Sequence, residues 1–269
     1  MPTNESAAAP PRRASTVVVA RDCAADGGIE VLLIQRHAGL RFMGGVYVFP
    51  GGAVQASDEK LTLGSPVAVP PPAWPHAAEA SFDRAHAMAA VRETFEEVGL
   101  LLGAPILDRS QLQELRKQAL SGVDFGALLA SARLKLDLGA LIPLIRWVTP
   151  SSEPIRFDTR FYVAAAPKQQ IAEHDARECV ALQWLTPSTA LEKAQRAELV
   201  LAPPTKRTLQ EFEQVESVEA LLQHARRSDA PTVEPVVKEI DGVRLLLFPG
   251  DPAHPVATRA LSGPTRVRI

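Results

Sequence analysis

One short stretch of the sequence, residues 88–100, combines a regular apolar stripe with a cluster of carboxylates and restricts the fold more than any other. At about 100° per residue, an α-helix gathers four apolar side chains on one face, namely Met88, Val91, Phe95 and Val98. The opposite face carries three carboxylates, Glu93, Glu96 and Glu97. Gly99 follows, and glycine readily takes the positive φ that ends a helix. The pattern therefore predicts an amphipathic helix that packs on a core and stops before Gly99.

The carboxylate face is electrostatically unfavourable for an isolated helix. Like charges three or four residues apart cost about 0.2–0.5 kcal/mol per pair, and each anion in the last turn opposes the helix dipole by about 0.3–1 kcal/mol. Arg92 offsets part of this repulsion by pairing with Glu96. The remainder favours a bound cation, because three carboxylates and water suit a hard ion such as Mg²⁺. The simpler alternative is a solvated acidic face without a ligand.

A second feature, Phe-Pro-Gly-Gly at residues 49–52, lies upstream of the acidic helix. Together the two segments resemble the signature of the Nudix hydrolases, which runs from a glycine pair to Arg-Glu-x-x-Glu-Glu-x-Gly and an apolar residue. The helical half matches at Arg92, Glu93, Glu96, Glu97, Gly99 and Leu100. The family has a further glutamate six residues after the second glycine and eight before the arginine. Here these positions are Asp58 and Arg84, so an insertion splits the signature, and Asp58 is only a weak substitute for that glutamate.

The resemblance implies a fold and a set of residue roles. The fold would be an α/β/α Nudix sandwich around a mixed sheet, with the signature as strand, loop and helix. The ligands of one or more Mg²⁺ or Mn²⁺ ions would be the Gly51 carbonyl, Glu93, Glu96 and Glu97. Arg92 and Gly52 would support this site. Such ions neutralise a diphosphate and lower the pKa of the water that attacks phosphorus.

A loop acid ahead of a tryptophan adds a metal ligand or a general base in several Nudix enzymes. Glu178, six residues before Trp184, is the candidate for this role here. His174 is the runner-up, although a lone loop histidine is more often solvated.

Residues 32–52 carry a second resemblance, to the coenzyme A diphosphatases within the Nudix family. The positions in register with their pattern are Leu32, Leu33, Arg36, Arg41, Gly45, Phe49, Pro50, Gly51 and Gly52. Ile34 replaces a threonine of that pattern, and His37 replaces a small residue. Two arginines beside a glycine-rich turn suit a ligand with several phosphates, so Arg36, Arg41 and Gly45 are the candidate substrate-binding residues. The alternative is that both arginines form surface salt bridges.

Residues 56–80 form the insertion, and their many prolines argue against a regular helix or a central strand. We expect a long loop there, acting as a lid or a specificity element. The chain also resembles a peroxisomal acyl-coenzyme A diphosphatase branch of the family. The resemblance lies in an insertion at this place and in the helix sequence Arg-Glu-Thr-Phe-Glu-Glu. Trp74 could stack on an adenine, although an aromatic residue among prolines is more often packed locally.

The rest of the pattern divides the chain into a flexible tail at 1–15, a Nudix hydrolase domain at 16–200 and a helical and hairpin extension packed on it at 201–269. Strands are predicted at 16–20, 29–35, 46–49, 141–149, 156–165 and 179–185. Helices are predicted at 108–120, 125–134, 187–198, 209–214 and 218–227, with a chain break at Pro203-Pro204 and a hairpin at 239–248. The helices at 108–134 are extra to a minimal Nudix core, and we favour covering the core over holding an acyl chain as their role.

Composition narrows the function classes. A formal net charge of −2 over 269 residues argues against a nucleic-acid partner. No apolar run reaches the length of a transmembrane helix, and residues 1–15 lack the apolar centre of a signal peptide. Cys23 and Cys179 form neither a metal-binding spacing nor a disulfide framework, which is typical of reduced thiols in the cytoplasm. We therefore expect a cytoplasmic location without membrane association; a homodimer is compatible with the resemblance, since many Nudix enzymes are dimers.

The predicted function is metal-dependent hydrolysis of the diphosphate bond of coenzyme A or acyl-coenzyme A, giving 3′,5′-ADP and 4′-phosphopantetheine or its acyl form. A Nudix hydrolase of another nucleoside diphosphate, such as ADP-ribose or NADH, is an alternative that needs the same acids but makes the register of Arg36 and Arg41 accidental. A non-catalytic ligand sensor is a second alternative, although such proteins usually lose signature glutamates and all three helical acids are present here. An RNA-cap hydrolase is a third, which the weak charge balance disfavours.

Overall fold

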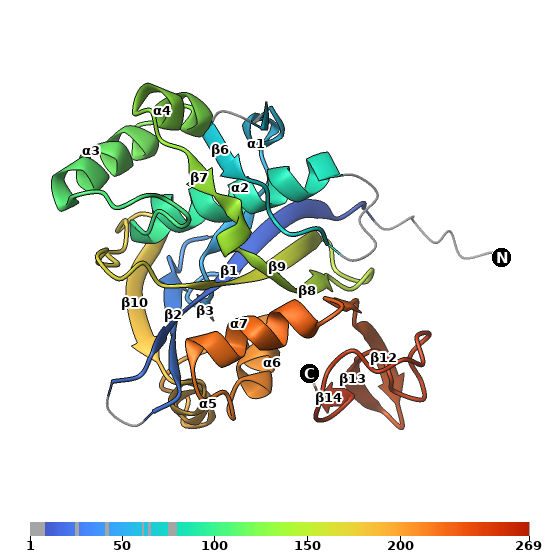
Figure 1. Ribbon diagram of the computed structural model, residues 1–269. Helices are drawn as coiled ribbons and strands as arrows, with labels where there is room; N and C mark the ends of the chain where they lie inside the picture. The colour runs from blue at the N-terminus through green and yellow to red at the C-terminus, as the bar shows by residue number, and fades with distance from the viewer. Residues whose placement is uncertain are drawn as a thin grey trace.

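The computed structural model describes residues 9–24, 27–40, 43–60, 62–63, 66–74 and 80–268. A mixed sheet of eight strands lies at the centre of the fold (Figure 1). Its main order is β10 (Cys179–Leu185), β2 (Ile29–Arg36), β1 (Arg12–Asp22), β9 (Phe157–Ala165), β8 (Ile142–Val148) and β11 (Thr232–Val233). Two short strands complete it, β3 (Tyr47–Val48) beside β2 and β4 (Gly51–Ala53) beside β1. The sheet is mixed because β1 runs parallel to β9 and antiparallel to β2.

Helices cover both faces of this sheet (Figure 1). One face carries α2 (Ala80–Val98), α3 (Arg109–Leu120) and α4 (Phe125–Ser131). The other carries α5 (Pro187–Gln195), α6 (Pro203–Glu211) and α7 (Val218–Arg227). Successive residues of β1 alternate between the faces, so that Val17 and Val19 join one apolar core while Val18 and Ala20 join the other. The predicted α/β/α sandwich around a mixed sheet is confirmed.

The acidic helix forms as predicted. Its apolar residues Met88, Val91, Phe95 and Val98 are each no more than 1% exposed. The helix ends at Val98, and Gly99 follows with a φ of +74°. Further up the same helix, residues 85–91 are all buried; α2 contacts the main sheet and also residues 56–59 of the insertion and residues 138–140.

The first strand begins earlier than expected. β1 starts at Arg12, so the expected tail at 1–15 is wrong for its last four residues. Those residues are ordered by pairing on both sides: β9 pairs from Arg12 onward, and β4 pairs at Ala14, Ser15 and Thr16. Residues 1–8 of the expected tail lie outside the described residues.

The expectation of a long loop at 56–80 is wrong for much of the insertion. It contains α1 (Ala56–Glu59), β5 (Thr62–Leu63) and β6 (Pro66–Val69). β6 is the central strand of a second sheet, between β5 and β7 (Leu136–Asp137), which leads into the short 3₁₀ helix η1 (Leu138–Ala140). Pro66 is tolerated because it is the first residue of its strand. Trp74 is 5% exposed and packs edge-on against Tyr162 with ring centroids 5.5 Å apart, so local packing of Trp74 is confirmed.

The C-terminal third contains one further correction. Pro203-Pro204 begin α6 and do not break the chain, because the first helical turn has no backbone N–H partners to lose. The helix predicted at 209–214 is therefore placed too late. β12 (Val236–Ile240) and β13 (Val243–Leu247) form the predicted hairpin, with positive φ at Asp241 and Gly242, and β14 (Arg266–Arg268) pairs with β13.

The division of the chain into 16–200 and 201–269 stays an interpretation, since α6 and α7 pack on the same sheet as the earlier elements. No helix within the described ranges is both long and apolar enough to cross a membrane.

Candidate active site

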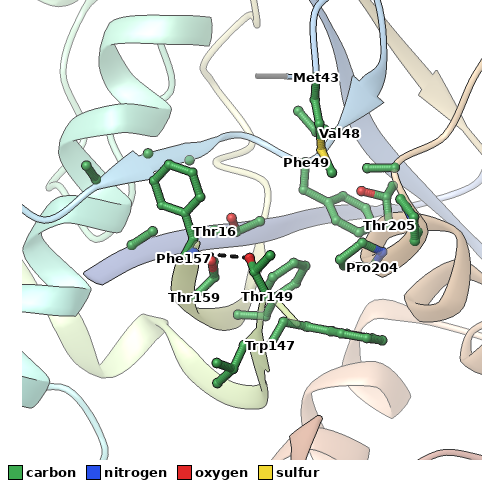
Figure 2. Close-up of a pocket in the computed structure, with 18 of the residues that line it drawn as sticks. Thr16, Met43, Val48, Phe49, Trp147, Thr149, Phe157, Thr159, Pro204 and Thr205 are labelled. Atoms are coloured by element: carbon green, nitrogen blue, oxygen red, sulfur yellow. Dashed lines mark hydrogen bonds between the residues drawn. The ribbon is translucent and has the colours of Figure 1, made fainter. Parts of the chain in front are cut away.

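A cavity of about 640 Å³ lies where the two halves of the signature meet. Gly51 and Gly52 line it from β4, while Glu93 and Glu96 line it from the last turns of α2. Arg36 and Glu178 also reach it. Figure 2 shows another part of its wall, where Phe49, Trp147 and Pro204 surround the space. A cavity of this size suits a small organic ligand.

The glycine pair brings β4 against both β1 and α2. Gly51 has a φ of +153°, and an added Cβ would overlap the carbonyl oxygen of Ser15 on β1. Its backbone N–H donates a hydrogen bond to Glu97 Oε2 over 2.9 Å. A Cβ on Gly52 would overlap the carboxylate of Glu93. Only glycine at these two positions allows the backbone to approach the acids so closely.

Arg92 connects the acids of α2 to the insertion. Its guanidinium donates to Glu93 over 2.7 Å and to Glu96 over 3.3 Å. It also donates two hydrogen bonds, of 3.1 and 3.0 Å, to Asp58, and both side chains are almost fully buried. Asp58 was expected to be only a weak substitute for the missing glutamate; its buried ion pair with Arg92 gives it a structural place at the site, and whether it replaces that glutamate stays a prediction. The short helix α1 carries Asp58 far enough inward for an aspartate to reach the arginine.

Burial and mutual repulsion make the acids reluctant to ionise. Burial, together with repulsion from Glu93, raises the pKa of Glu96 to about 7, although Arg92 opposes the shift. Burial also raises the pKa of Glu93, with added repulsion from Glu178. The pKa of Glu97 is raised well above its ordinary value by burial and by the nearby Glu93 carboxylate. A nearby cation would relieve all three shifts.

The donor chemistry of the site fits a hard divalent cation. The side chains of Glu93, Glu96 and Glu97 offer carboxylate oxygens, the ligands that Mg²⁺ and Mn²⁺ prefer. These side chains are partly shielded from water. Within the described ranges, no three or more His, Cys, Asp or Glu side chains are grouped so that they could hold a metal ion. Arg92 instead holds Glu93 and Glu96 by hydrogen bonds. The metal-ligand roles of Gly51, Glu93, Glu96 and Glu97 stay predictions.

The other predicted site residues fall into two groups. Arg36 lies at the cavity, forms no salt bridge with any described residue, and has a buried Nε without a hydrogen-bond partner among them. Glu178 lies at the cavity too, as an exposed side chain. Gly45 is not among the described residues that line the cavity. Its N–H donates a hydrogen bond to the Arg36 carbonyl over 3.0 Å in a turn. His174 lies on a separate surface hollow, and Arg41 lies outside the described residues.

Sequence reasoning missed the apolar part of the cavity. Trp147, Phe157 and Phe161 come from two neighbouring strands, and Leu246 and Phe248 come from the C-terminal extension. No motif joins these positions, which are far apart in the chain. Phe-Pro-Gly at 248–250 repeats the tripeptide at 49–51, but this repeat did not indicate that Phe248 lines the cavity.

Comparison with known proteins agrees with the site. The NUDT19 Nudix domain matches residues 75–212, which are 138 of the 269 residues. A crystal structure of a Nudix hydrolase from Alicyclobacillus acidocaldarius is 33% identical, with a TM-score of 0.64, covering 80% of this chain and 96% of that one.

Two curated relatives carry the name acyl-coenzyme A diphosphatase NUDT19. The protein from Gallus gallus is 29% identical over 65% of this chain and 58% of its own length. The protein from Homo sapiens is 29% identical over 66% of this chain and 58% of its own length. The chain thus spans less than two thirds of the length of these relatives. By the extent of the domain match and the likeness to the bacterial structure, the chain belongs to the Nudix hydrolases, in the family described by the NUDT19 Nudix domain.

Proposed function

We propose that this protein is a metal-dependent diphosphatase that cleaves the diphosphate bond of coenzyme A or acyl-coenzyme A. The observation that carries the proposal is one cavity lined by Gly51-Gly52, by Glu93 and Glu96 of α2, and by Arg36, whose buried Nε has no hydrogen-bond partner among the described residues. The names of the chicken and human relatives support this choice of substrate. The products would be 3′,5′-ADP and 4′-phosphopantetheine or its acyl form.

The acidic and basic residues of the site would have different roles in the reaction. Glu93, Glu96, Glu97 and the Gly51 carbonyl would hold Mg²⁺ or Mn²⁺, which supplies charge neutralisation of the diphosphate and a water of lowered pKa. Arg92 keeps Glu93 and Glu96 in place through its hydrogen bonds. Arg36 would bind phosphate oxygens and stabilise the charge that develops on the leaving phosphate. Glu178 would accept the proton of the attacking water, since it shares the cavity with the α2 acids.

The site and the composition support further parts of the proposal. A free small molecule, and not a nucleic acid, is the expected substrate, because the formal net charge is −2. Cytoplasmic location is proposed because Cys23 and Cys179 are both free thiols. Light scattering during gel filtration would decide whether the protein is a homodimer.

A substrate panel tests the proposal directly. The purified chain would be assayed with coenzyme A, acyl-coenzyme A, ADP-ribose and NADH, each with Mg²⁺, with Mn²⁺ and with a chelator. We expect coenzyme A and its acyl ester to be cleaved fastest, with release of 3′,5′-ADP, and the chelator to abolish the reaction. Faster cleavage of ADP-ribose or NADH would favour the alternative nucleoside diphosphatase, and binding without turnover of any substrate would favour a sensor.

A further inference from the structure

The C-terminal part of the chain supplies an uncharged wall to the cavity. The described residues after position 200 that line it are Ala202, Pro203, Pro204, Thr205, Pro235, Val237, Leu246 and Phe248. None of them carries a charge, and Thr205 alone has a polar side chain. A phosphate or an adenine edge is recognised by cations and hydrogen-bonding groups. This wall offers few of either, so its chemistry suits an aliphatic group.

The wall is built on a fixed framework. Val237 on β12 lies directly opposite Leu246 on β13 in the antiparallel register, so the two side chains project from the same face of the hairpin. Phe248, just after β13, packs edge-on against Trp147 of β8 with ring centroids 6.2 Å apart. The guanidinium of Arg207 from α6 lies over the Phe248 ring, 5.3 Å from its centroid. These contacts tie the hairpin to the main sheet and to α6.

The uncharged wall is continuous with the charged part of the site. The same cavity is lined by Val237 and Leu246 of the hairpin and by the acids Glu93 and Glu96. A substrate with its diphosphate at Gly51-Gly52 can therefore extend an uncharged half along Trp147 and the hairpin. No residue of α3 or α4 is part of the described lining, so these helices cover the core, as we expected.

We infer that the β12–β13 hairpin and the start of α6 form the subsite for the non-nucleotide half of the substrate, the pantetheine arm with its acyl group, and that Val237 and Leu246 set its selectivity. The inference rests on the proposed function, since it assumes a coenzyme A substrate. The nucleotide half, with its 3′-phosphate, then lies toward Arg36 and the charged end of the cavity.

Leu246→Trp tests this assignment by filling the wall. The two reaction products serve as separate probes: 3′,5′-ADP for the nucleotide half and S-acyl-4′-phosphopantetheine for the other half. We expect the variant to raise the KM for acyl-coenzyme A and the inhibition constant of the acyl product by about tenfold, because a bulky ring occupies the space. The inhibition constant of 3′,5′-ADP should stay within about twofold of the wild-type value.

Leu245→Trp is the matched control, because Leu245 is the neighbouring residue, lies outside the cavity lining and points to the other face of the hairpin. It should leave all three constants near their wild-type values. If Leu246→Trp unfolds the hairpin, seen as a lowered melting temperature, Val237→Phe places a ring in the same space from the paired strand.

The outcomes separate the inference from the proposed function. Weaker 3′,5′-ADP binding with unchanged binding of the acyl product would overturn the inference while leaving coenzyme A hydrolysis intact. Equal effects of Leu246→Trp and Leu245→Trp would overturn it too. A wild-type protein that cleaves neither coenzyme A nor its esters would overturn both.

Discussion

At the scale of single residues, the buried pair of Arg92 and Asp58 controls the charge balance of the site. Arg92 is 3% exposed and Asp58 is 2% exposed. The hydrogen bond and attraction of Asp58, together with attraction from Glu93 and Glu96, raise the pKa of Arg92 although burial opposes this shift. The guanidinium of Arg92 therefore stays positively charged beneath the acids at any ordinary pH. Asp58 supplies part of the negative charge that balances it.

Asp58→Ala should destabilise the fold strongly. The change leaves the guanidinium of Arg92 buried without its main partner, which typically costs about 3–5 kcal/mol of unfolding free energy. Urea denaturation would measure the loss. Glu59→Ala is the matched control, since Glu59 is the next residue but its side chain is half-exposed and pairs with Arg13 at the surface, where ion pairs contribute about 0–1 kcal/mol. Similar losses for both variants would contradict the role given to Asp58.

Glu97→Gln should separate catalysis from folding. Glu97 is 4% exposed, and burial raises its pKa, so an uncharged glutamine of the same shape should leave the melting temperature unchanged or raise it. Because Glu97 is a proposed metal ligand, the loss of its charge should lower kcat by about a hundredfold or more. Glu114→Gln, at an exposed position on α3, should change neither quantity. Unchanged activity in Glu97→Gln would support the ligand-sensor alternative.

At the scale of elements, the insertion helps to fix α2 against the rest of the fold. α1 brings Asp58 to Arg92, and the chain that follows β6 places Trp74 in the core beside Tyr162. The guanidinium of Arg160 lies 5.3 Å from the Trp74 ring centroid and forms a largely buried ion pair with Asp83 of α2. The insertion thus splits the signature in sequence while it holds the two halves together in space.

Trp74→Ala should therefore affect stability and leave substrate binding unchanged. Removal of a buried tryptophan typically costs about 3–5 kcal/mol, because it leaves a cavity. Thermal unfolding would show the loss, and the KM for coenzyme A should stay near the wild-type value at a temperature where the variant is folded. A raised KM with an unchanged melting temperature would instead indicate that Trp74 stacks on the adenine.

The elements that the sequence predicted well are those with a local signal. The apolar stripe and Gly99 defined the end of α2, and β10 and α7 have the predicted bounds. The insertion was mispredicted because β6 depends on its partner β7, about 70 residues away, and proline content says nothing about such pairing. The apolar wall of the cavity was missed for the same reason, since Trp147 and Leu246 meet through the fold alone.

At the scale of the whole molecule, a buried polar contact ties α2 to the first strand. His86 is 2% exposed, and its Nδ1 lies 3.1 Å from Ser15 Oγ and 3.1 Å from the Ala14 carbonyl oxygen. Burial, with repulsion from Arg160, lowers the pKa of His86 to about 3. The histidine is therefore neutral in the folded protein at pH values where it would be charged in the unfolded chain.

This shift makes folding stability depend on pH. The lowered pKa means that the unfolded chain binds the proton first, so the contribution of His86 is complete above its unfolded pKa of about 6.5 and is lost as the pH falls toward 3. The free energy of unfolding should fall by up to about 1.4 kcal/mol per pH unit below about pH 6 from this group. Urea denaturation of His86→Gln should show a shallower pH dependence. His224→Gln, at an exposed position on α7, should keep the wild-type slope; equal slopes for all three proteins would contradict the assignment.

The place of the hairpin after the acids and the central strands also sets an order of events during synthesis. The ribosome releases a chain from its N-terminus onward, so the glycine pair, the acids and the central strands emerge before Val237 and Leu246. The hairpin part of the cavity wall can therefore form only after the residues of the charged part have been made. The proposed selectivity for an acyl group would accordingly arise later in synthesis than the charged half of the site.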